Sequence, residues 1–289
     1  MSEQEPFSWA HQLWKTIYIL AATLLLIGLG VMLNLLVLPL IAHAIQDPLY
    51  QSGIYFEEGL HLYQQQQWDQ AAQKFRLALQ SNPSHPNAHN NLGSILAQTG
   101  YLEEALHEFE LELSLNLLNG DRRGESIINL AQTHHNLANV LLAKGDLFLA
   151  IEQLQMAVDL DPALIESHIA LGEALYQEDQ HHAAQEQLKI AMDLNPRDAR
   201  IYYVMGMVER RMDPIKSVDS FSLAIQLKPD WAAAHNGLGV SLAQTGQMNA
   251  AIEQFKWALQ LDPHLQEAEQ NWYLAVEKSI QSFPSVAVG

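Results

Sequence analysis

The stretch Asn91-Leu92-Gly93-Ser94-Ile95-Leu96-Ala97-Gln98-Thr99-Gly100 returns later as Gly237-Leu238-Gly239-Val240-Ser241-Leu242-Ala243-Gln244-Thr245-Gly246, with Leu, Gly, Leu, Ala, Gln, Thr and Gly in the same places. A pattern that recurs at a fixed period indicates a repeat architecture, in which each unit buries its apolar face only by stacking on its neighbours. The repeat therefore predicts the fold of this chain.

Six repeats of about 34 residues can be delimited around this pattern. They are numbered here 1 to 6 and cover residues 52–85, 86–119, 131–164, 165–198, 199–231 and 232–265. Small residues such as Gly93 and Ala138 allow a neighbouring helix to approach closely. Gly100, Gly145 and Gly246 can adopt the left-handed conformation that ends a first helix, and a Pro such as Pro162 stops the second. Each repeat is thus predicted to be a helix hairpin, and the chain to be all-α.

Three segments depart from the regular spacing. Repeat 2 lacks its closing Pro, so its second helix is expected to continue to a junction at 120–130, where Gly120 can end one helix and Asp121 can begin the next. Repeat 5 is one residue short near Met212-Asp213-Pro214. Residues 266–282 are predicted to form a capping helix, with Trp272, Leu274, Ala275 and Ile280 available to cover the last apolar face, ahead of a flexible tail at 283–289.

These positions resemble the tetratricopeptide repeat family over residues 52–265. The resemblance implies a right-handed superhelical solenoid of about six helix hairpins. Where that family usually has an aromatic residue at the fourth place of a repeat, this chain has His89, His134, His168 and His235. We interpret these four as packing or helix-contact residues.

The composition excludes several classes of function. The net charge is -18, with 15 Lys and Arg among 33 acidic residues, which argues against a nucleic-acid ligand. The absence of Cys removes disulfides and thiolate chemistry. Adjacent His pairs such as His134-His135 and His181-His182 point about 100° apart on a helix and do not form a two-ligand face. No nucleotide loop, nucleophile elbow or metalloprotease motif is present, so we expect no metal, no cofactor and no enzymatic activity.

An apolar segment precedes the repeats. After a tail at 1–16, the run Ile17 to Leu38 has 22 residues without a formal charge. As a helix it would be about 33 Å long, enough to cross a hydrocarbon core of ~30 Å. We expect a transmembrane anchor at 17–42 and a linker at 43–51. An alternative is signal-peptide cleavage after Ala44, which would release an exported periplasmic or lumenal protein.

The resemblance also implies a binding surface, because the first helix of each pair in this family lines an inner groove. The amide-bearing and imidazole positions predicted to contact a partner there are Asn90, Asn91, His135, Asn136, Asn139 and Asn236. Asn side chains both donate and accept hydrogen bonds and can hold an extended backbone; the alternative is that they are ordinary polar residues on an exposed helix face. Repeat 5 adds a basic strip of Arg200, Tyr203 and Arg210, with Arg211 beside it, which could hold a carboxylate.

The expected function is a non-catalytic, membrane-anchored scaffold that binds a protein or peptide partner through its groove. Its length and architecture look like those of the cyanobacterial thylakoid proteins of this class, which assist photosynthetic complex or chlorophyll biogenesis. The alternative is a structural subunit that assembles through its anchor and convex faces. The thylakoid resemblance implies repeats on the cytoplasmic face, whereas Lys15, by the positive-inside tendency, favours the opposite face.

Overall fold

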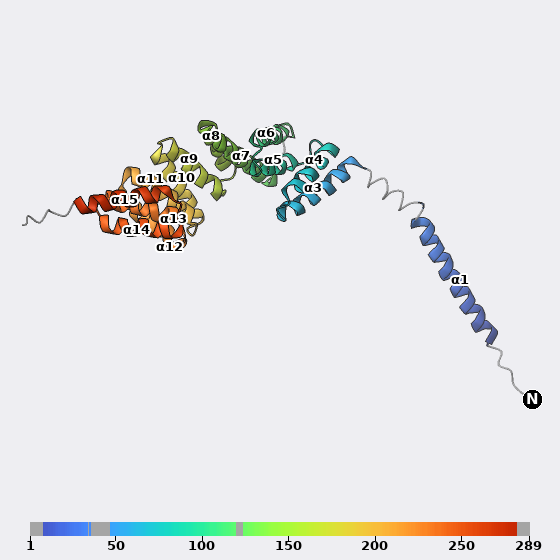
Figure 1. Ribbon diagram of the computed structural model, residues 1–289. Coiled ribbons are helices and arrows are strands. Elements are labelled where there is room, and N and C mark those ends of the chain that lie inside the picture. The colour runs from blue at the N-terminus through green and yellow to red at the C-terminus, as the bar shows by residue number, and fades with distance from the viewer. Residues whose placement is uncertain (1–7, 34, 36–46, 120–123, 282–289) are drawn as a thin grey trace, which may run out of the picture. The chain divides into compact units, whose positions relative to one another are not determined.

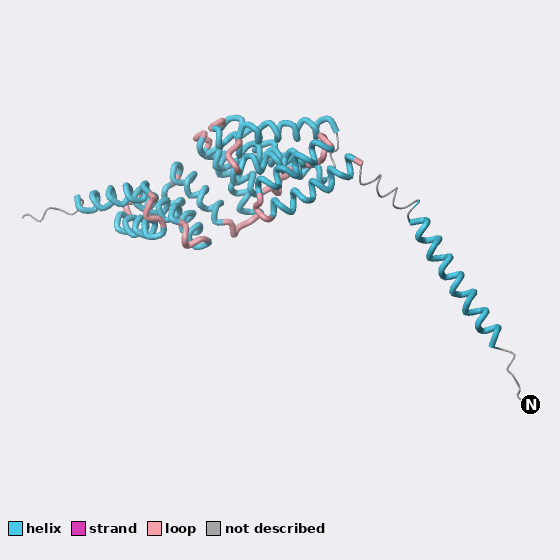
Figure 2. The backbone as a smooth tube through the Cα atoms, turned by 45° about the vertical axis from the view of Figure 1, so that its right-hand side comes forward, coloured by secondary structure: helices cyan, strands magenta, loops and turns pink. Residues whose placement is uncertain are grey.

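The computed structural model describes residues 8–33, 35, 47–119 and 124–281, and these contain fourteen helices and no strand (Figures 1 and 2). The chain divides into two compact bodies, 1–92 and 93–289. We refer to them as the N-terminal body and the C-terminal body and describe each by itself. The expectation of an all-α helical-repeat solenoid is confirmed.

The N-terminal body contains α1 (Ser8–Met32), α3 (Pro48–Gln64), α4 (Trp68–Ser81) and the start of α5 (Ala88–Gln98). Helices α3 and α4 form the hairpin of repeat 1. α3 begins inside the expected linker, because Pro48 is at its first turn and the Asp47 side chain accepts a hydrogen bond from the Leu49 amide at 2.9 Å. The helix of repeat 1 therefore starts four residues ahead of residue 52.

The C-terminal body continues the hairpins. Its helices are α6 (Leu102–Asn119), α7 (Gly124–Lys144), α8 (Leu147–Leu160), α9 (Ile165–Gln177), α10 (His181–Leu194), α11 (Ala199–Met212), α12 (Pro214–Leu227), α13 (Ala232–Gln244), α14 (Met248–Leu261) and α15 (Gln266–Gln281). From α7 on, each first helix packs on the second helix of its own repeat and of the preceding one, and first helices contact one another from α9 to α15. The first helices therefore form one layer and the second helices another.

Close approach within each hairpin depends on a small residue opposite a large one. A Cβ atom at Gly239 would lie 2.5 Å from a ring carbon of Phe255, and one at Gly93 would lie 2.9 Å from Phe109. Repeat 4 uses Gly172 against Leu188 in the same way. The predicted role of these small residues is confirmed, because no side chain could occupy the same space without moving the aromatic ring or the helix.

The turns between paired helices also follow the prediction. Gly100, Gly145 and Gly246 have φ of +86°, +86° and +82°. In repeat 5 the turn is reduced to one residue, since Asp213 ends α11 and also begins α12. The missing residue of that repeat is therefore located where the sequence indicated.

The fourth-place histidines are held inside the array. In His168 and His235, Nδ1 lies 2.8 Å from Oε1 of Gln187 and Gln254, and Nε2 lies 3.0 and 3.1 Å from the carbonyl oxygens of Pro162 and Pro229. His134 makes the same contact with Gln153, and His89 with the Pro83 carbonyl. The interpretation of these residues as packing residues is confirmed.

Helix α15 closes the array, but with fewer residues than expected. Ala275 is buried in a cluster with Phe255 and Leu242, and Trp272 packs against that cluster. Leu274 and Ile280 are exposed, because the face that α14 and α13 contact is filled by the other two side chains. The expectation that all four residues cover the last apolar face was wrong for these two.

The N-terminal segment was expected to contain a transmembrane helix. None of the helices within the described ranges combines the length and apolarity that a membrane span requires. The expected span and its flanks include residues 34 and 36–46, which lie outside the described residues, as do Ala44 with its cleavage site, Gly120-Asp121 and the tail at 283–289.

Candidate functional site

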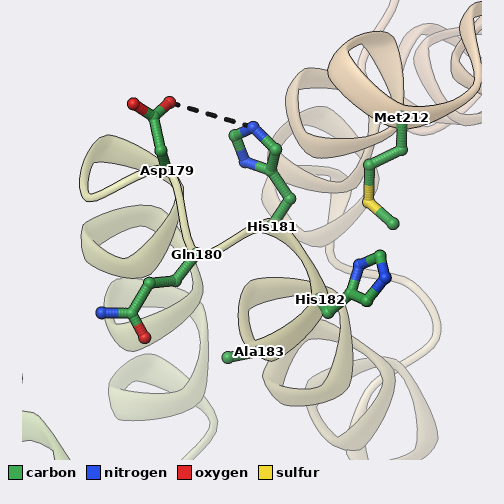
Figure 3. A pocket seen from close by; sticks show the side chains of 6 residues that line it. All are labelled: Asp179, Gln180, His181, His182, Ala183 and Met212. Carbon is green, nitrogen blue, oxygen red and sulfur yellow. Dashed lines mark ion pairs between the residues drawn. The ribbon is translucent and has the colours of Figure 1, made fainter.

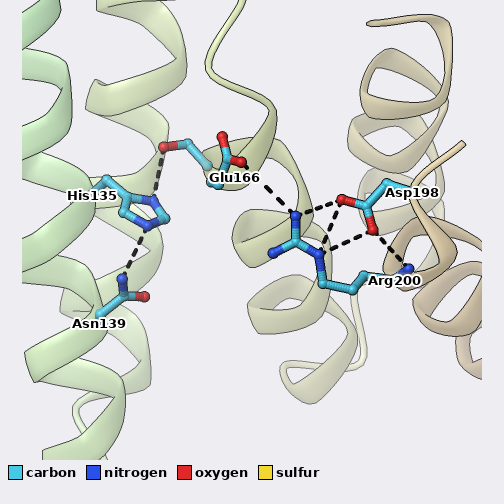
Figure 4. A network of polar contacts seen from close by, with 6 residues as sticks. His135, Asn139, Glu166, Asp198 and Arg200 are labelled. Carbon is cyan, nitrogen blue, oxygen red and sulfur yellow. Dashed lines mark hydrogen bonds and ion pairs between the residues drawn. The ribbon is translucent and has the colours of Figure 1, made fainter. Parts of the chain in front are cut away.

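His135 and Asn139 lie on successive turns of α7 and form a short polar chain (Figure 4). Asn139 Nδ2 lies 3.0 Å from His135 Nε2, and His135 Nδ1 lies 3.0 Å from Ser167 Oγ on α9. Since an amide nitrogen only donates, this chain is consistent with a neutral imidazole that accepts at Nε2 and donates at Nδ1. Burial lowers the pKa of His135, while Glu166 acts in the opposite direction. These two predicted site residues thus join neighbouring repeats.

The predicted asparagines are also hydrogen-bonded within the protein. Asn136 accepts from Gln132 at 3.0 Å and donates to Ser94 on α5 at 3.3 Å. Asn236 is buried and accepts from Asn271 on α15 at 3.0 Å. In the N-terminal body, Asn91 donates to the carbonyl of residue 87 at 2.8 Å, and Asn90 is half-buried. The amides of Asn136 and Asn236, which were expected to face a ligand, therefore connect neighbouring helices of the first-helix layer.

Arg200 does not present a free positive charge. Its guanidinium pairs with Asp198 and lies 3.9 Å from Glu166 (Figure 4). The hydrogen bond from Arg200 lowers the pKa of the Asp198 carboxyl and raises the pKa of Arg200. The sequence prediction of a basic strip from Arg200 to Arg211 is therefore too long, because two carboxylates from α9 and the preceding turn neutralise its first member.

Tyr203 is committed to packing. Its ring stacks on Trp231 with centroids 4.5 Å apart and meets Phe221 edge-on at 5.8 Å. Burial raises the pKa of the Tyr203 hydroxyl, and the charge of Arg210 counteracts this in part. Tyr203 thus supports the wall next to Arg210.

Two of the predicted residues, Arg210 and Asn236, do come together. They line an open hollow of about 360 Å³ between α11, α13 and α15. The other lining residues are Arg211, Val240, Gln244, Glu267, Gln270 and Asn271. The side chain of Tyr176 raises the pKa of Arg211. Within the described residues, no ion pair joins either guanidinium of this hollow to a carboxylate. All three helices are first helices or the cap, so the hollow is on the first-helix layer.

The residues Gln244, Gln270 and Asn271 were not predicted. Gln270 and Asn271 lie on α15, which the sequence assigned only a covering role, and Gln244 ends α13. Their alignment with Arg210 depends on how three repeats stack. No periodicity in the sequence indicates how far these three side chains lie from Arg210.

A second hollow, of about 470 Å³, lies at the turn between α9 and α10 and the end of α11 (Figure 3). It is lined by Asp179, Gln180, His181, His182, Ala183 and Met212. His181 Nε2 is 3.8 Å from Asp179, while its buried Nδ1 has no hydrogen-bond partner. No group of three or more potential His, Asp or Glu metal ligands occurs in the part of the chain that the structure describes. The hollow thus holds two imidazoles, of which that of His181 lies near a carboxylate.

The geometry defines the class first: helix hairpins that pack through a small residue opposite a large one form a helical-repeat solenoid. Tetratricopeptide repeat family models match residues 56–114, 138–179 and 232–265. These three segments are therefore tetratricopeptide repeats, a fold that typically serves as a non-catalytic protein-interaction module.

Solved structures agree on the fold. The chain is similar to YrrB, described as a tetratricopeptide repeat protein with an unusual peptide-binding site, with 22% identity, a TM-score of 0.55, and coverage of 69% of this chain and 97% of YrrB. PilF of Pseudomonas aeruginosa matches with 19% identity, a TM-score of 0.63, and coverage of 76% and 96%. The Cut9-Hcn1 tetramer structure matches with 16% identity, a TM-score of 0.65, and coverage of 83% and 45%. Comparison with curated protein sequences gives no significant match.

Proposed function

We propose that this protein is a scaffold that binds a peptide segment of another protein along its first helices and holds an acidic group of that segment at Arg210 and Arg211. The observation that carries this proposal is the hollow between α11, α13 and α15, where two guanidinium groups adjoin amide side chains in a protein of net charge -18. The peptide-binding site of YrrB lies on the same fold and is in keeping with this use.

The chemistry of the hollow fits a carboxylate attached to a peptide backbone. Guanidinium groups bind carboxylates through paired, charge-assisted hydrogen bonds. The amides of Gln244 and Gln270 can donate to backbone carbonyls and accept from backbone amides. Glu267 at the same hollow would repel a second negative charge, so a single acidic group next to neutral residues is favoured over an acidic run.

Substitution of both arginines tests this function. We expect Arg210→Ala with Arg211→Ala to reduce partner recovery in affinity purification from solubilised membranes at least tenfold, with an unchanged circular-dichroism spectrum. The matched control is Lys189→Ala with Lys256→Ala, which removes the same charge from exposed sites on α10 and α14. Equal recovery with both double variants would refute a role for this hollow.

We expect a different outcome when the asparagines of α7 are substituted. Because Asn136 and Asn139 are hydrogen-bonded to Ser94 and His135, we expect Asn136→Ala with Asn139→Ala to lower the melting temperature as well as partner capture. Loss of capture without any loss of stability would show that these two amides act only on the partner.

We also propose that residues 17–38 attach the protein to a membrane. The support is the uncharged apolar run itself, together with the exposure of Leu24, Leu25 and Leu26 on α1. Deletion of 1–46 should move the protein from the carbonate-resistant membrane fraction to the supernatant. An unchanged distribution would exclude this attachment.

The membrane we propose is the thylakoid, with the repeats on its cytoplasmic face, in the manner of Pitt, the partner of protochlorophyllide oxidoreductase. This choice rests on the resemblance in length and architecture alone. Protease digestion of sealed thylakoid vesicles should then remove the repeats; complete protection would support the lumenal alternative that follows from Lys15 or from cleavage after Ala44.

A further inference from the structure

The second helices of repeats 3 to 6 carry an exposed large apolar side chain at one and the same position. These residues are Met156 on α8, Ile190 on α10, Leu223 on α12 and Trp257 on α14, with exposed fractions of 47%, 40%, 42% and 51%. Each follows by two residues the buried side chain that fills the centre of its hairpin, for example Leu223 after Phe221. Two residues correspond to about 200° on a helix, so these four side chains point away from the core. We call them the outer apolar row.

A turn later, three of the helices repeat the feature with Leu194, Leu227 and Leu261, which are also exposed. One turn before the outer apolar row, every one of the four helices carries an exposed carboxylate. These are Glu152, Glu186, Asp219 and Glu253, the outer acidic row. Residues four apart lie on the same helix face. Each of these helices therefore presents a carboxylate followed by an apolar side chain on its outward face.

Stacking brings these faces into register. Each second helix contacts the first helices of its own and the next repeat in the same order from α8 to α14. A position that recurs in each repeat consequently recurs along the second-helix layer of the C-terminal body. Other outward positions on these helices are polar, such as Gln155, Ser222, Gln226 and Gln260. Phe148 and Leu149 on α8 and Ile215 on α12 are exposed as well, near the starts of their helices. In the middle and last turns of the helices, the large exposed apolar side chains recur in rows.

Packing of the hairpins does not account for Met156, Ile190 and Leu223, whereas the exposed Trp257 ring also stacks on His235 with centroids 6.3 Å apart. The hairpin centres are filled by residues that are fully buried, including Leu154, Leu188 and Phe221. Single exposed apolar residues are common, whereas a set aligned across several elements marks an interaction surface. We propose that this surface docks an amphipathic helix of another protein, with apolar side chains on one face and Lys or Arg beside them.

The outer acidic row selects this occupant. A second copy of the chain would bring its own acidic row and a net charge of -18 to the contact, and an anionic lipid surface would meet the same repulsion. Lys256 offsets one member, since its Nζ lies 2.7 Å from Glu253, but both residues are exposed and such a pair contributes little. Glu152, Glu186 and Asp219 remain to attract a cationic helix flank.

A synthetic helical peptide of Leu and Lys, with Leu at i, i+3 and i+4 spacing, serves as the probe, and the same peptide with Glu for Lys as its counterpart. We expect the full chain to bind the Leu/Lys peptide and not the Leu/Glu peptide in isothermal titration calorimetry. Replacement of the outer apolar row by Gln, as Met156→Gln, Ile190→Gln, Leu223→Gln and Trp257→Gln, should raise Kd at least tenfold. The matched control replaces Gln155, Ser222, Gln226 and Gln260 by Ala and should leave Kd unchanged.

The acidic row and the place of binding are tested separately. Glu152→Gln, Glu186→Gln and Asp219→Asn together should weaken binding and reduce its dependence on salt. Because the chain has no Cys, Ser222→Cys introduces a single thiol next to Leu223 for a photo-crosslinker, and Asn139→Cys provides the corresponding probe on the first-helix layer. We expect cross-linking from position 222 only.

Four results would overturn the proposal. Equal affinity of the Gln-substituted and native chains would show that the outer apolar row makes no contact. Equal binding of the Leu/Glu peptide, or cross-linking from position 139, would reject the acidic row or the location. Dissociation of a native dimer by the Gln substitutions, without any effect on peptide binding, would assign the surface to self-association. Circular dichroism of each variant ensures that loss of binding is not loss of fold.

Discussion

Individual side chains in repeat 5 depart from the pattern that repeats 3, 4 and 6 share. Tyr202 stands in the fourth place, and its hydroxyl donates to the Pro196 carbonyl at 3.0 Å, as a histidine does elsewhere. Ser220 stands where Gln187 and Gln254 bind a histidine, and it donates instead to Glu209. Glu209 is only 8% exposed and occupies the place of Leu62, Leu96, Leu141, Leu175 and Leu242. Repeat 5 thus contains a carboxyl group where a leucine would complete the core.

A prediction for pH dependence follows from Glu209. Burial raises its pKa above the ordinary value of 4.5, so the folded protein keeps this proton to higher pH than the unfolded chain. The contribution to stability is full below the ordinary pKa and is lost as pH rises through the folded-state pKa. Glu209→Gln should therefore raise the free energy of unfolding at pH 8 by on the order of 1 kcal/mol, and much less at pH 4, in urea titrations. An equal effect at both pH values would contradict a charge-based cause.

We expect the contribution of His135 to stability to have the opposite pH dependence. Burial lowers its pKa below the ordinary 6.5, so the unfolded chain takes up the proton first as pH falls. Its stabilising contribution is present above pH 6.5 and is lost as pH falls toward the folded-state pKa. His135→Asn should reduce the decline of melting temperature between pH 7 and pH 5. His85, which is half-buried and stacks on Phe56, serves as a control through His85→Asn.

The hairpin is the element that this sequence repeats. Its two helices approach until a glycine on the first meets a large side chain on the second, as Gly239 meets Phe255. Repeat 3 achieves the same contact with a different pair, Ala138 and Leu154, at the equivalent positions. A larger residue on the first helix is therefore compatible with a smaller one on the second. Gly with Phe and Ala with Leu have similar summed volumes, whereas the pair of Gly172 and Leu188 in repeat 4 is smaller.

A double-mutant cycle tests this compensation. Gly239→Ala places a Cβ 2.5 Å from the Phe255 ring, and we expect it to destabilise the protein by about 1–3 kcal/mol. Phe255→Leu should restore much of that loss when combined with Gly239→Ala, because the pair then equals that of repeat 3. Additive losses in chemical denaturation would show that the two sites do not share one space.

On the scale of the whole molecule, the array must end with a helix that needs no further neighbour. Helix α15 fulfils this role in the C-terminal body, with Ala275 and Trp272 against the cluster of Leu238, Leu242 and Phe255. Its other side carries Leu274 and Ile280 in exposed positions. The same helix contributes Gln270 and Asn271 to the hollow of the first-helix layer. The cap is therefore both a stabilising element and part of the candidate site.

Truncation after Leu265 removes α15 and so tests whether this helix stabilises the remaining repeats. Exposure of the cluster should lower stability by on the order of 2 kcal/mol, or ~4–8 °C in melting temperature for a body of this size, and promote aggregation. Leu274→Lys with Ile280→Lys should cause no comparable loss, since both side chains are exposed. Differential scanning calorimetry and light scattering measure both. A truncated chain as stable as the full one would show that α15 covers nothing essential.

Much of the fold could be predicted because its determinants are local. The Gly that ends a first helix, the Pro that stops a second and the shortened turn at Asp213 act within a few residues of their own positions. Because each repeat contacts only its neighbours, the conformation predicted for one repeat also predicts how the following repeats stack along the chain.

The sequence alone thus determined the helix hairpins, their stacking and the inward place of the fourth-position histidines. Only the tertiary structure decided that Glu166 of the preceding repeat also lies near Arg200, that Asn236 is bonded to Asn271, and that Arg210 remains at a hollow. These outcomes depend on distances between side chains of different repeats. Helix packing in three dimensions sets those distances, and no local rule of chain conformation contains them.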